Sequence, residues 1–355
     1  MSTGSVFSHP EFDDHEEVVF ARDPAAGLSA IIAVHDTTLG PAMGGCRVWS
    51  YKTDGEALTD VLRLSRGMSY KAALAGMPFG GGKSVIVTAP GQAKTPHMMR
   101  AMGRIVDRLG GRYIIAEDVG TSVEDMDLIA GETKHVAGVS GYDGDPSPST
   151  ALGVFLCTRS AVRRRFGRDL TGCHVAVKGL GHVGYELCRL LHEAGAKLTV
   201  ADIDRNAVAR ASEAFRAQPA KVDEILTVEA DVFAPCALGK DLSAVTIPRM
   251  RAGIVCGSAN NQLATPEDDE RLRRREILYC PDYLVNAGGL ISAAGRLIGL
   301  TEDGVRQKLD ALPDTLDSVL DTAEKTGRAP GATADSIARA RFRPTHEPQE
   351  HRRSA

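Results

Sequence analysis

A glycine-rich turn stands between a β-branched segment and a helical segment in the second half of the sequence. Residues 174–178 (HVAVK) predict a strand, residues 185–194 predict a helix, and residues 179–184 (GLGHVG) join them. Glycines at these spacings allow a tight turn, close approach of a pyrophosphate and helix–strand packing, and the helix N-terminus favours an anion. The residues that we expect to contact a bound dinucleotide here are Gly179, Gly181, His182, Val183 and Gly184.

An acidic residue ends the next predicted strand. Residues 197–201 (KLTVA) form that strand, and Asp202 follows it, eighteen residues after Gly184. A carboxylate at this place can bind the adenosine ribose hydroxyls and would repel a 2′-phosphate. The sequence therefore predicts NAD rather than NADP, although Arg205 is close by.

Three later apolar segments, residues 231–237, 253–257 and 277–279, continue a doubly wound sheet. Small or polar residues follow each segment, at the edge where a nicotinamide would lie. Paired asparagines often cap turns, but this position favours ligand contact. The candidates for cofactor contact at this edge are Ala237, Asn260 and, more weakly, Asn286.

Two lysines stand in one stretch of the first half. Lys71 follows a helical pattern over residues 54–68 and lies on its apolar face if the helix continues. Lys83 directly follows glycines 80–82, which leave room for a small ligand. A partly desolvated lysine near another cation has a lowered pKa and can act as a base. The alternative is a glycine turn that leads into a strand over residues 84–87, with Lys83 in solvent.

Two further segments supply groups of suitable chemistry. Asp118 comes after Glu117 at the end of a predicted strand, residues 113–116, where α/β sheets bind ligands. A carboxylate opposite a lysine of low pKa would form an acid/base couple, although both acids could instead cap the next helix. Gly44 and Gly45 leave backbone amides uncovered, which suits a carboxylate or an ordinary turn.

The length of 355 residues predicts two domains. A net charge of −4 gives no basic field for nucleic acid. The absence of an 18-residue apolar run and of a signal sequence predicts a cytoplasmic protein without a membrane anchor. The seven cysteines are widely spaced and lack a C-x-x-C pair, so we expect reduced thiols and no metal site.

Residues 141–148 (GYDGDPSP) are rich in glycine, proline and aspartate and predict a linker. We expect an N-terminal α/β domain over residues 1–145 and a Rossmann-type domain over residues 146–328, with a cleft between them. Residues 329–355 are expected to hold a helix that returns to the first domain, followed by a disordered polar tail.

The assembled segments resemble the amino-acid dehydrogenase family that includes leucine, valine, phenylalanine and glutamate dehydrogenases. They occur in the family's order and cover nearly the whole chain except its ends. The segments are TLGPAMGGCR (38–47), LSRGMSYKAALAGMPFGGGKSVI (64–86), AEDVGTSVEDMD (116–127), GLGHVG (179–184), DVFAPCALG (231–239), GSANNQL (257–263) and YCPDYLVNAGG (279–289).

The resemblance implies NAD-dependent, reversible oxidative deamination of an L-amino acid to a 2-oxo acid and ammonia. By position, Lys71 should bind the substrate carboxylate, assisted by the amides of Gly44 and Gly45. Lys83 should be the base that activates water, and Asp118 should relay protons to and from the amino nitrogen. Asn260 should lie near both substrate and nicotinamide. The family also implies closure of the cleft and homo-oligomerisation through the N-terminal domain.

The resemblance also bears on the substrate side chain. Met43 stands where glutamate enzymes carry a lysine, so an apolar side chain is favoured. The general pattern looks most like leucine dehydrogenase, but several pocket positions depart from it. Space at Ala137 and Ala293 would admit a ring, whereas Leu74 removes some, so phenylalanine or tryptophan is the alternative. The expected side-chain pocket comprises Met43, Met68, Leu74, Ala137, Leu290 and Ala293.

Two other classes of function fit the sequence less well. A hydroxy-acid dehydrogenase usually has a histidine base, and His35 and His182 fall outside the positions expected for it. A non-catalytic NAD-binding sensor would not need Lys83 and Asp118, and both are present.

Overall fold

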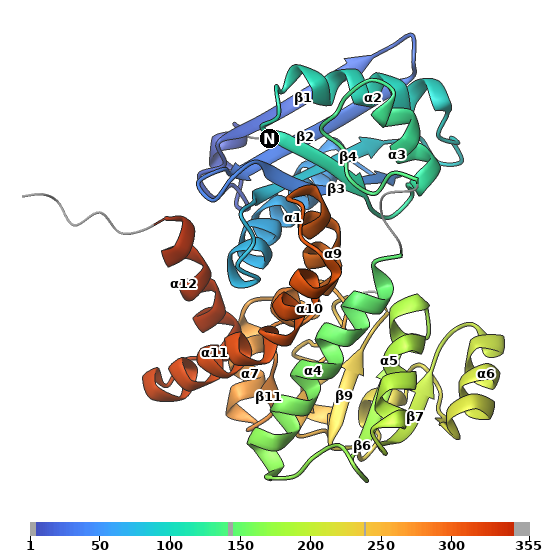
Figure 1. Cartoon of the computed structure of the whole chain (residues 1–355), viewed down its shortest axis with the longest axis vertical. Coiled ribbons are helices and arrows are strands. Elements are labelled where there is room, and N and C mark those ends of the chain that lie inside the picture. Colours follow the sequence, from blue (N-terminus) through green and yellow to red (C-terminus); the bar gives the residue numbers. More distant parts are fainter. Residues whose placement is uncertain (1–4, 141–144, 238, 344–355) are drawn as a thin grey trace, which may run out of the picture.

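The computed structural model describes residues 5–140, 145–237 and 239–343, which form two α/β parts, each built on one sheet (Figure 1). This arrangement confirms the predicted fold class. Part of the expected linker, residues 141–144, and the expected disordered tail, residues 344–355, lie outside the described residues.

The N-terminal sheet has the strand order β1-β2-β4-β3-β5. β1 and β4 both run antiparallel to β2, whereas β3 lies parallel to β4 and to β5. Helix α1 packs on one face, and α2 and α3 pack on the other. The bounds are β1 (Glu17–Asp23), β2 (Leu28–Asp36), β3 (Ala42–Trp49), β4 (Gly80–Val87), β5 (Tyr113–Glu117), α1 (Asp54–Leu74), α2 (Pro96–Arg108) and α3 (Val123–Ala130), after a short 3-10 helix η1 (Val6–Ser8).

The three glycines before Lys83 belong to β4, which begins at Gly80. The alternative of a glycine turn that leads into a strand at residue 84, with Lys83 in solvent, was therefore wrong. A Cβ on Gly81 would lie 2.1 Å from the Ser69 nitrogen of α1, and one on Gly82 would lie 2.6 Å from the Tyr113 ring. The glycines thus allow α1 and β5 to approach the strand closely, a requirement of packing that a local turn rule does not contain.

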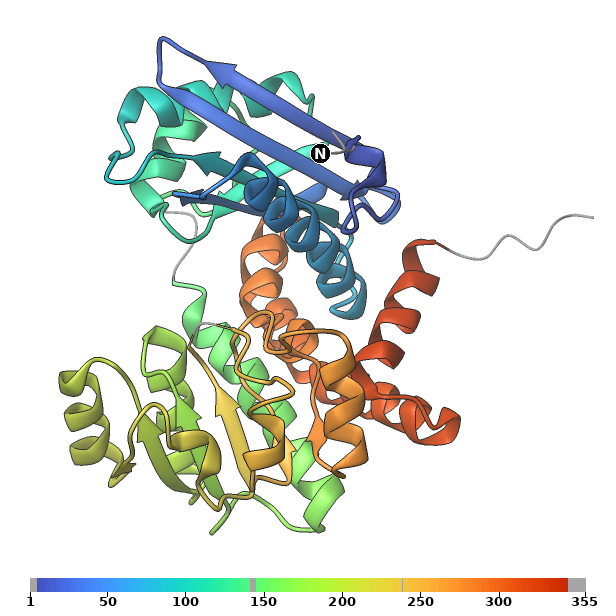
Figure 2. The ribbon, with the colours of Figure 1, turned by 180° about the vertical axis from the view of Figure 1, so that it is seen from behind.

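The C-terminal sheet is wholly parallel, with the order β11-β10-β9-β6-β7-β8. The strand order reverses direction between β6 and β9, so their carboxyl ends form a switch point for ligand binding. The arrow of β9 points towards the N-terminal part (Figures 1 and 2). The strands are β6 (His174–Lys178), β7 (Lys197–Ala201), β8 (Gln218–Pro219), β9 (Val232–Pro235), β10 (Ile254–Val255) and β11 (Leu278–Tyr279).

Helices cover this sheet and connect it back to the N-terminal part. They are α4 (Ser147–Phe166), α5 (His182–Glu193), α6 (Arg205–Phe215), α7 (Glu267–Arg274), α8 (Asp282–Val285), α9 (Gly288–Leu297), α10 (Glu302–Asp310), α11 (Leu312–Thr326) and α12 (Pro330–Phe342), with 3-10 helices η2 (Ile225–Thr227) and η3 (Ile247–Arg249).

The last helix, α12, packs against α1 (Figure 2). The Phe342 ring stacks on Tyr70 with their centroids 5.6 Å apart. Arg341 donates a hydrogen bond to the carbonyl of Ala73 at 2.6 Å, in the last turn of α1. The C-terminal helix therefore stabilises the end of the helix that carries Lys71. Within the described ranges, no helix is long and apolar enough to cross a membrane.

Candidate active site

Lys83 and Asp118 form an ion pair on the N-terminal sheet, with 2.8 Å between Nζ and Oδ2. Lys83 lies on β4 and is 6% exposed, while Asp118 directly follows β5. Strand β3 runs between these two strands and presents Gly45 beneath the pair. A Cβ on Gly45 would lie 2.6 Å from the Asp118 Cβ and 3.2 Å from the Lys83 Nζ. The pair can therefore form only because that position on β3 has no side chain.

A second cation, Arg47, contacts the same carboxylate oxygen. Its Nε donates to Asp118 Oδ2 at 3.0 Å, and its Nη1 donates to Asp60 of α1 at 2.8 Å. Burial alone would raise the pKa of Asp118, but Lys83 and Arg47 outweigh it and hold that pKa below its usual value. The site therefore contains an ionised carboxylate held between two cations.

Arg47 and Asp60 were missed by reasoning from the sequence. Arg47 lies two residues after Gly45 on β3, and alternate residues of a strand face the same side. That alternation could have placed Arg47 beside the glycine pair. The contact with Asp60 depends on how α1 crosses the sheet, so no local pattern could have found it.

Lys71 lies near the end of α1 and reaches the C-terminal part. Its Nζ donates to Asn260 Oδ1 at 3.3 Å, so the structure brings together two residues that the sequence predicted for one site. Burial lowers the pKa of Lys71 to about 8, opposed by the negative charge of Asp282 and reinforced by the positive charge of Lys83. Lys71 is therefore a cation that titrates close to neutral pH.

An apolar cluster takes up most of the predicted side-chain pocket. Met43, Leu74 and Ala137 are buried in it, and Leu290 and Ala293 of α9 pack against it. Met68 is half-buried on α1 and is not part of this cluster. Two residues of β5 that the sequence did not single out, Ile114 and Ala116, also pack against the cluster.

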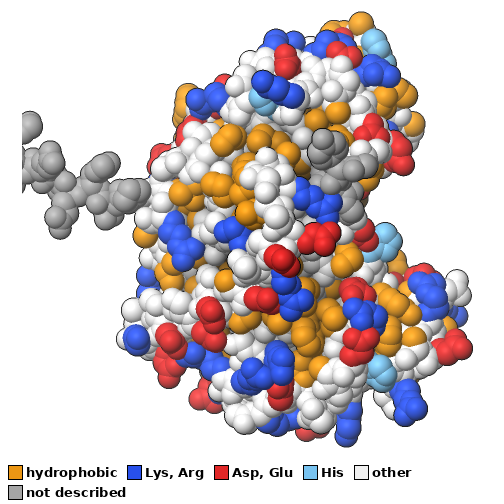
Figure 3. All heavy atoms as spheres, viewed as in Figure 1, with side chains coloured by type: hydrophobic (Ala, Val, Ile, Leu, Met, Phe, Trp, Pro, Cys, Tyr) orange, Lys and Arg blue, Asp and Glu red, His pale blue; other side chains and the backbone are white. Residues whose placement is uncertain are grey.

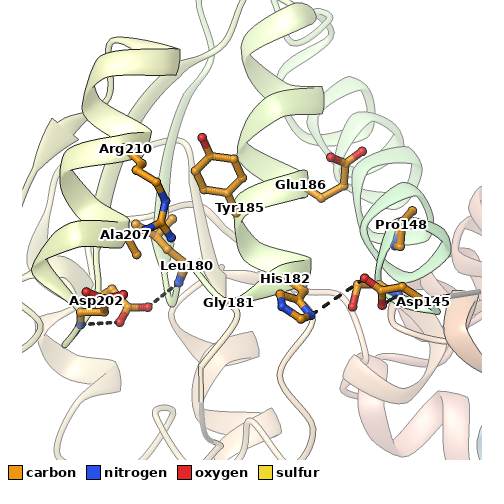
Figure 4. Close-up of a pocket in the computed structure, with 12 residues that line it drawn as sticks. Asp145, Pro148, Leu180, Gly181, His182, Tyr185, Glu186, Asp202, Ala207 and Arg210 are labelled. Carbon is orange, nitrogen blue, oxygen red and sulfur yellow. Dashed lines mark hydrogen bonds and ion pairs between the residues drawn. The ribbon is translucent and has the colours of Figure 1, made fainter. Parts of the chain in front are cut away.

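A pocket of about 500 Å³ lies at the carboxyl ends of β6 and β7 (Figure 4). Asp202 lines it and accepts hydrogen bonds from the Leu180 nitrogen at 2.5 Å and from the Asp204 nitrogen at 2.8 Å. His182 begins α5 at its edge and lies 3.9 Å from Asp145, whose chain segment enters α4. The molecule is hollowed between its two parts in the surface view (Figure 3). The remaining lining residues are Ser147, Pro148, Gly181, Tyr185, Glu186, Ala207 and Arg210.

The glycine turn fits a dinucleotide. Gly179 has a φ of +100°, and a Cβ there would lie 2.6 Å from the Ala237 nitrogen. A Cβ on Gly184 would lie 2.0 Å from the Gly179 oxygen, whereas Gly181 has open space around it for a pyrophosphate. Val183 is half-buried and packs towards the sheet core. The turn therefore combines close backbone packing with free space at the helix N-terminus.

A buried hydrogen-bond acceptor on Asn286 is a second feature that fits a bound nucleotide. Asn286 donates through Nδ2 to Asn260 Oδ1 at 2.8 Å and to the Ser258 carbonyl at 3.0 Å. Its Oδ1 is buried and has no hydrogen-bond partner among the described residues. Buried polar atoms are normally paired, so this oxygen is suited to accept a hydrogen bond from a bound molecule. The described residues hold no cluster of three or more potential metal ligands.

Two family models together match most of the chain. The Glu/Leu/Phe/Val dehydrogenase dimerisation domain matches residues 15–135, and the Glutamate/Leucine/Phenylalanine/Valine dehydrogenase domain matches residues 141–209 and 200–343. The first match covers the N-terminal part with Lys71 and Lys83, and the second covers the C-terminal part with the glycine turn.

Known proteins of this kind are similar over nearly their full lengths. Leucine dehydrogenase of Geobacillus stearothermophilus is 47% identical over 95% of this chain and 93% of that protein. Valine dehydrogenase of Streptomyces virginiae is 44% identical over 94% of this chain and 95% of that protein. The crystal structure of L-tryptophan dehydrogenase from Nostoc punctiforme superposes with a TM-score of 0.81 at 43% identity, covering 92% of this chain and 96% of that one. The chain therefore belongs to the Glu/Leu/Phe/Val dehydrogenase family of nicotinamide-dependent amino-acid dehydrogenases.

Proposed function

We propose that this enzyme catalyses the NAD-dependent, reversible oxidative deamination of an apolar L-amino acid of the leucine or branched-chain type. The products are the 2-oxo acid and ammonia. The observation that carries the proposal is the Lys83–Asp118 ion pair, which Arg47 joins to α1, the helix whose Lys71 contacts Asn260 of the nucleotide-binding part. The similarity to leucine dehydrogenases supports the choice of substrate.

In this mechanism Lys71 binds the substrate carboxylate together with the backbone at Gly44 and Gly45. A nicotinamide, held by the glycine turn and lying towards Asn260 and Asn286, would supply the acceptor for the hydride that leaves the substrate α-carbon. Neutral Lys83 takes a proton from the water that attacks the imino carbon, and Asp118 gives a proton to, or takes one from, the amino nitrogen. Lys83 and Arg47 both favour the ionised form of Asp118, because their side chains contact its carboxylate.

The lining of the apolar cluster favours an uncharged substrate side chain. Met43, Leu74 and Ala137 are each 2% exposed or less, and they offer no cation to a second carboxylate. A second candidate is an aromatic amino acid, supported by the small side chains of Ala137 and Ala293 and by the similarity to an L-tryptophan dehydrogenase. One methylene group more or less in a hydrophobic pocket changes the discrimination between two substrates by about 1–3 kcal/mol.

The cofactor proposal rests on Asp202, whose carboxylate would bind ribose hydroxyls and repel a 2′-phosphate. Gly179, Gly181, His182, Val183 and Gly184 would hold the pyrophosphate, and Ala237, Asn260 and Asn286 would lie towards the nicotinamide. We propose a homo-oligomer that assembles through the N-terminal part, in keeping with the dimerisation-domain match. Domain boundaries near residues 145 and 328 and a cytoplasmic location stay predictions from the sequence.

The test is the rate of NADH formation with leucine, valine, phenylalanine, tryptophan and glutamate at alkaline pH. We expect the aliphatic pair to react fastest and glutamate not to react. Faster reaction with phenylalanine or tryptophan would favour the aromatic candidate.

We expect Lys83→Ala to abolish turnover and leave NAD affinity nearly intact, since Lys83 lies outside the nucleotide-binding part. Lys325→Ala, at the end of α11, is the matched control and should keep the full rate; a Lys83→Ala variant that did the same would refute the mechanism.

A further inference from the structure

One oxygen of Asp118 is shared by two cations from two strands. Lys83 of β4 lies 2.8 Å from it and Arg47 of β3 lies 3.0 Å from it. The two cations differ in chemistry, because a guanidinium stays protonated whereas a lysine amine can serve as a base. The two contacts are therefore not equivalent during a reaction in which Lys83 exchanges a proton.

Arg47 is itself held in place by Asp60, which Tyr51 also contacts. Its Nη1 donates to Asp60 Oδ2 at 2.8 Å, and the Tyr51 hydroxyl donates to the same oxygen at 2.6 Å. Burial disfavours the charge on Arg47, but Asp118 and Asp60 outweigh it and raise its pKa. The guanidinium is thus a fixed, permanent positive charge, braced between α1 and the end of β5.

The proposed mechanism needs Lys83 to be neutral when it accepts a proton. At that moment Asp118 loses one of its two cations while it stays largely buried, and a buried carboxylate without a counter-charge tends to take up a proton. A carboxyl group that had already taken up a proton from elsewhere could not accept one from the amino nitrogen. Some fixed charge must therefore oppose this capture.

The other groups around Asp118 do not supply such a charge. Lys71 of α1 is positive, but burial lowers its pKa to about 8, so its charge is not permanent over the range of a pH profile. Burial raises the pKa of Cys46 on β3 to about 12 and raises the pKa of Tyr113 on β5 well above its usual value, so both remain neutral.

We propose that Arg47 is a positioning residue that keeps the Asp118 carboxylate ionised and oriented while Lys83 changes its protonation state. This inference rests on the proposed function and assigns a role to a residue outside the predicted site. In it, the Arg47–Asp60–Tyr51 chain anchors the proton-transfer pair to α1, the helix that also carries the carboxylate-binding Lys71.

The test compares pH profiles of kcat for the wild type, Arg47→Gln and Arg47→Lys. Loss of a cation beside Asp118 raises the pKa of that carboxyl, so the acid limb of the Arg47→Gln profile should move up by about one pH unit. Its kcat near pH 8, where Asp118 is ionised in both proteins, should fall at least about tenfold because the carboxylate loses its orientation, with a smaller change in KM for the amino acid. An unshifted limb with a uniform loss of rate, as a purely structural role would give, overturns the inference.

Arg47→Lys keeps a charge, but one that titrates near pH 10. Its acid limb should therefore match the wild type, and its rate relative to the wild type should fall as the pH passes about 10. If the relative rate of Arg47→Lys does not fall above about pH 10, a permanent charge is not required and the inference fails. This outcome can be measured even if Arg47→Gln does not fold. Arg159→Gln on α4, which breaks the contact with Asp169 beyond the end of that helix, is the control and should leave both limbs unchanged.

The Lys83→Ala variant distinguishes a failure of the proposed function from a failure of the role assigned to Arg47. If Lys83→Ala keeps most of its rate, the proposed function is wrong and the role of Arg47 falls with it. If Lys83→Ala is inactive while Arg47→Gln keeps the wild-type acid limb, only the inference about Arg47 is wrong.

Discussion

The Lys71 ammonium donates to the Asn260 amide oxygen at 3.3 Å, and this bond joins α1 to the loop after β10. Asn260 Oδ1 also accepts a hydrogen bond from Asn286 Nδ2 at 2.8 Å. The cation that we propose for the substrate carboxylate is thus already tied to an acceptor in the other part of the molecule. A substrate carboxylate must share or replace that acceptor, so its affinity depends on the full charge of Lys71.

We predict that carboxylate affinity weakens above pH 8. Burial lowers the pKa of Lys71 to about 8, so Lys71 is charged below that pH and neutral above it. The probe is the inhibition constant of 4-methylpentanoate, which is ionised throughout and has no amine to titrate. This constant should stay level from pH 6.5 to pH 7.5 and then rise up to about tenfold per pH unit.

Lys71→Arg is the matched variant for this prediction, because its guanidinium keeps its charge throughout the range. Its inhibition constant should be independent of pH up to pH 10, whatever its absolute value. A wild-type constant that also stays level to pH 10 would show that Lys71 does not titrate there or does not bind the carboxylate.

A second prediction concerns Gly45, which lies beneath the Lys83–Asp118 pair. The Cβ of Gly45→Ala would lie 2.6 Å from the Asp118 Cβ and 2.7 Å from the Glu117 carbonyl oxygen. The loop after β5 must move to accept it, and a displacement near 1 Å in a catalytic site can cost roughly 100-fold in rate. We expect kcat to fall by that order in an assay of NADH formation, with the protein still folded.

Gly67→Ala is the control for the added methyl group. Gly67 lies in the interior of α1, the helix that carries Lys71. A Cβ on Gly67 would meet no atom within 4 Å. We expect full activity and a gain in stability of about 0.5–1 kcal/mol, since alanine favours a helix. Equal losses of activity in both variants would mean that Gly45 has no special place in the site.

The sequence predicted the nucleotide-binding sheet well because its evidence is local. A β-branched strand, a glycine turn and a helix follow one another within residues 174–194, and Asp202 ends the next strand. The structure places Asp202 in the same pocket as the glycine turn, where it accepts a hydrogen bond from Leu180. Chain order and geometry agree here because each contact is made within one β-α-β unit.

The proton-transfer site could be predicted only in part. Lys83 and Asp118 were identified from their places beside predicted strands, and the structure pairs them. Arg47 and Asp60 were missed because their contacts depend on the crossing of α1 over the sheet, which local patterns do not determine. The same crossing explains Gly81 of β4, whereas Gly82 makes room for the Tyr113 ring of β5, and both needs resemble a turn signal in the sequence.

A third prediction concerns the choice between NAD and NADP. Asp202→Asn removes a negative charge and keeps one side-chain oxygen to accept the Leu180 N–H, so the glycine turn should be preserved. Relief of repulsion with a 2′-phosphate should reduce the kcat/KM preference for NAD roughly 10- to 100-fold. Asp202→Ala should show the same relaxation and also weaker binding of NAD. An unchanged preference in both variants would remove Asp202 from the basis of selection.

The last prediction concerns stability in acid, through a buried histidine beneath α1. His15 is 6% exposed, its Nδ1 accepts the Asp13 N–H at 3.1 Å, and its Nε2 lies 3.1 Å from the Leu62 carbonyl. An imidazole that accepts at one nitrogen and donates at the other is neutral. Burial, reinforced by His35, lowers the pKa of His15 to about 4.

The unfolded chain therefore binds a proton at this site at higher pH than the folded protein does. The stabilisation is complete above pH 6.5 and is lost as the pH falls from 6.5 to about 4, by on the order of 3 kcal/mol in total. We expect Tm to fall steeply over this window in the wild type. The slope should be shallower in His15→Gln, whose amide can accept and donate without titrating, and unchanged in His97→Gln, an exposed site on α2. Parallel slopes in all three proteins would show that acid sensitivity arises elsewhere, most directly at His35, whose pKa is also lowered by burial.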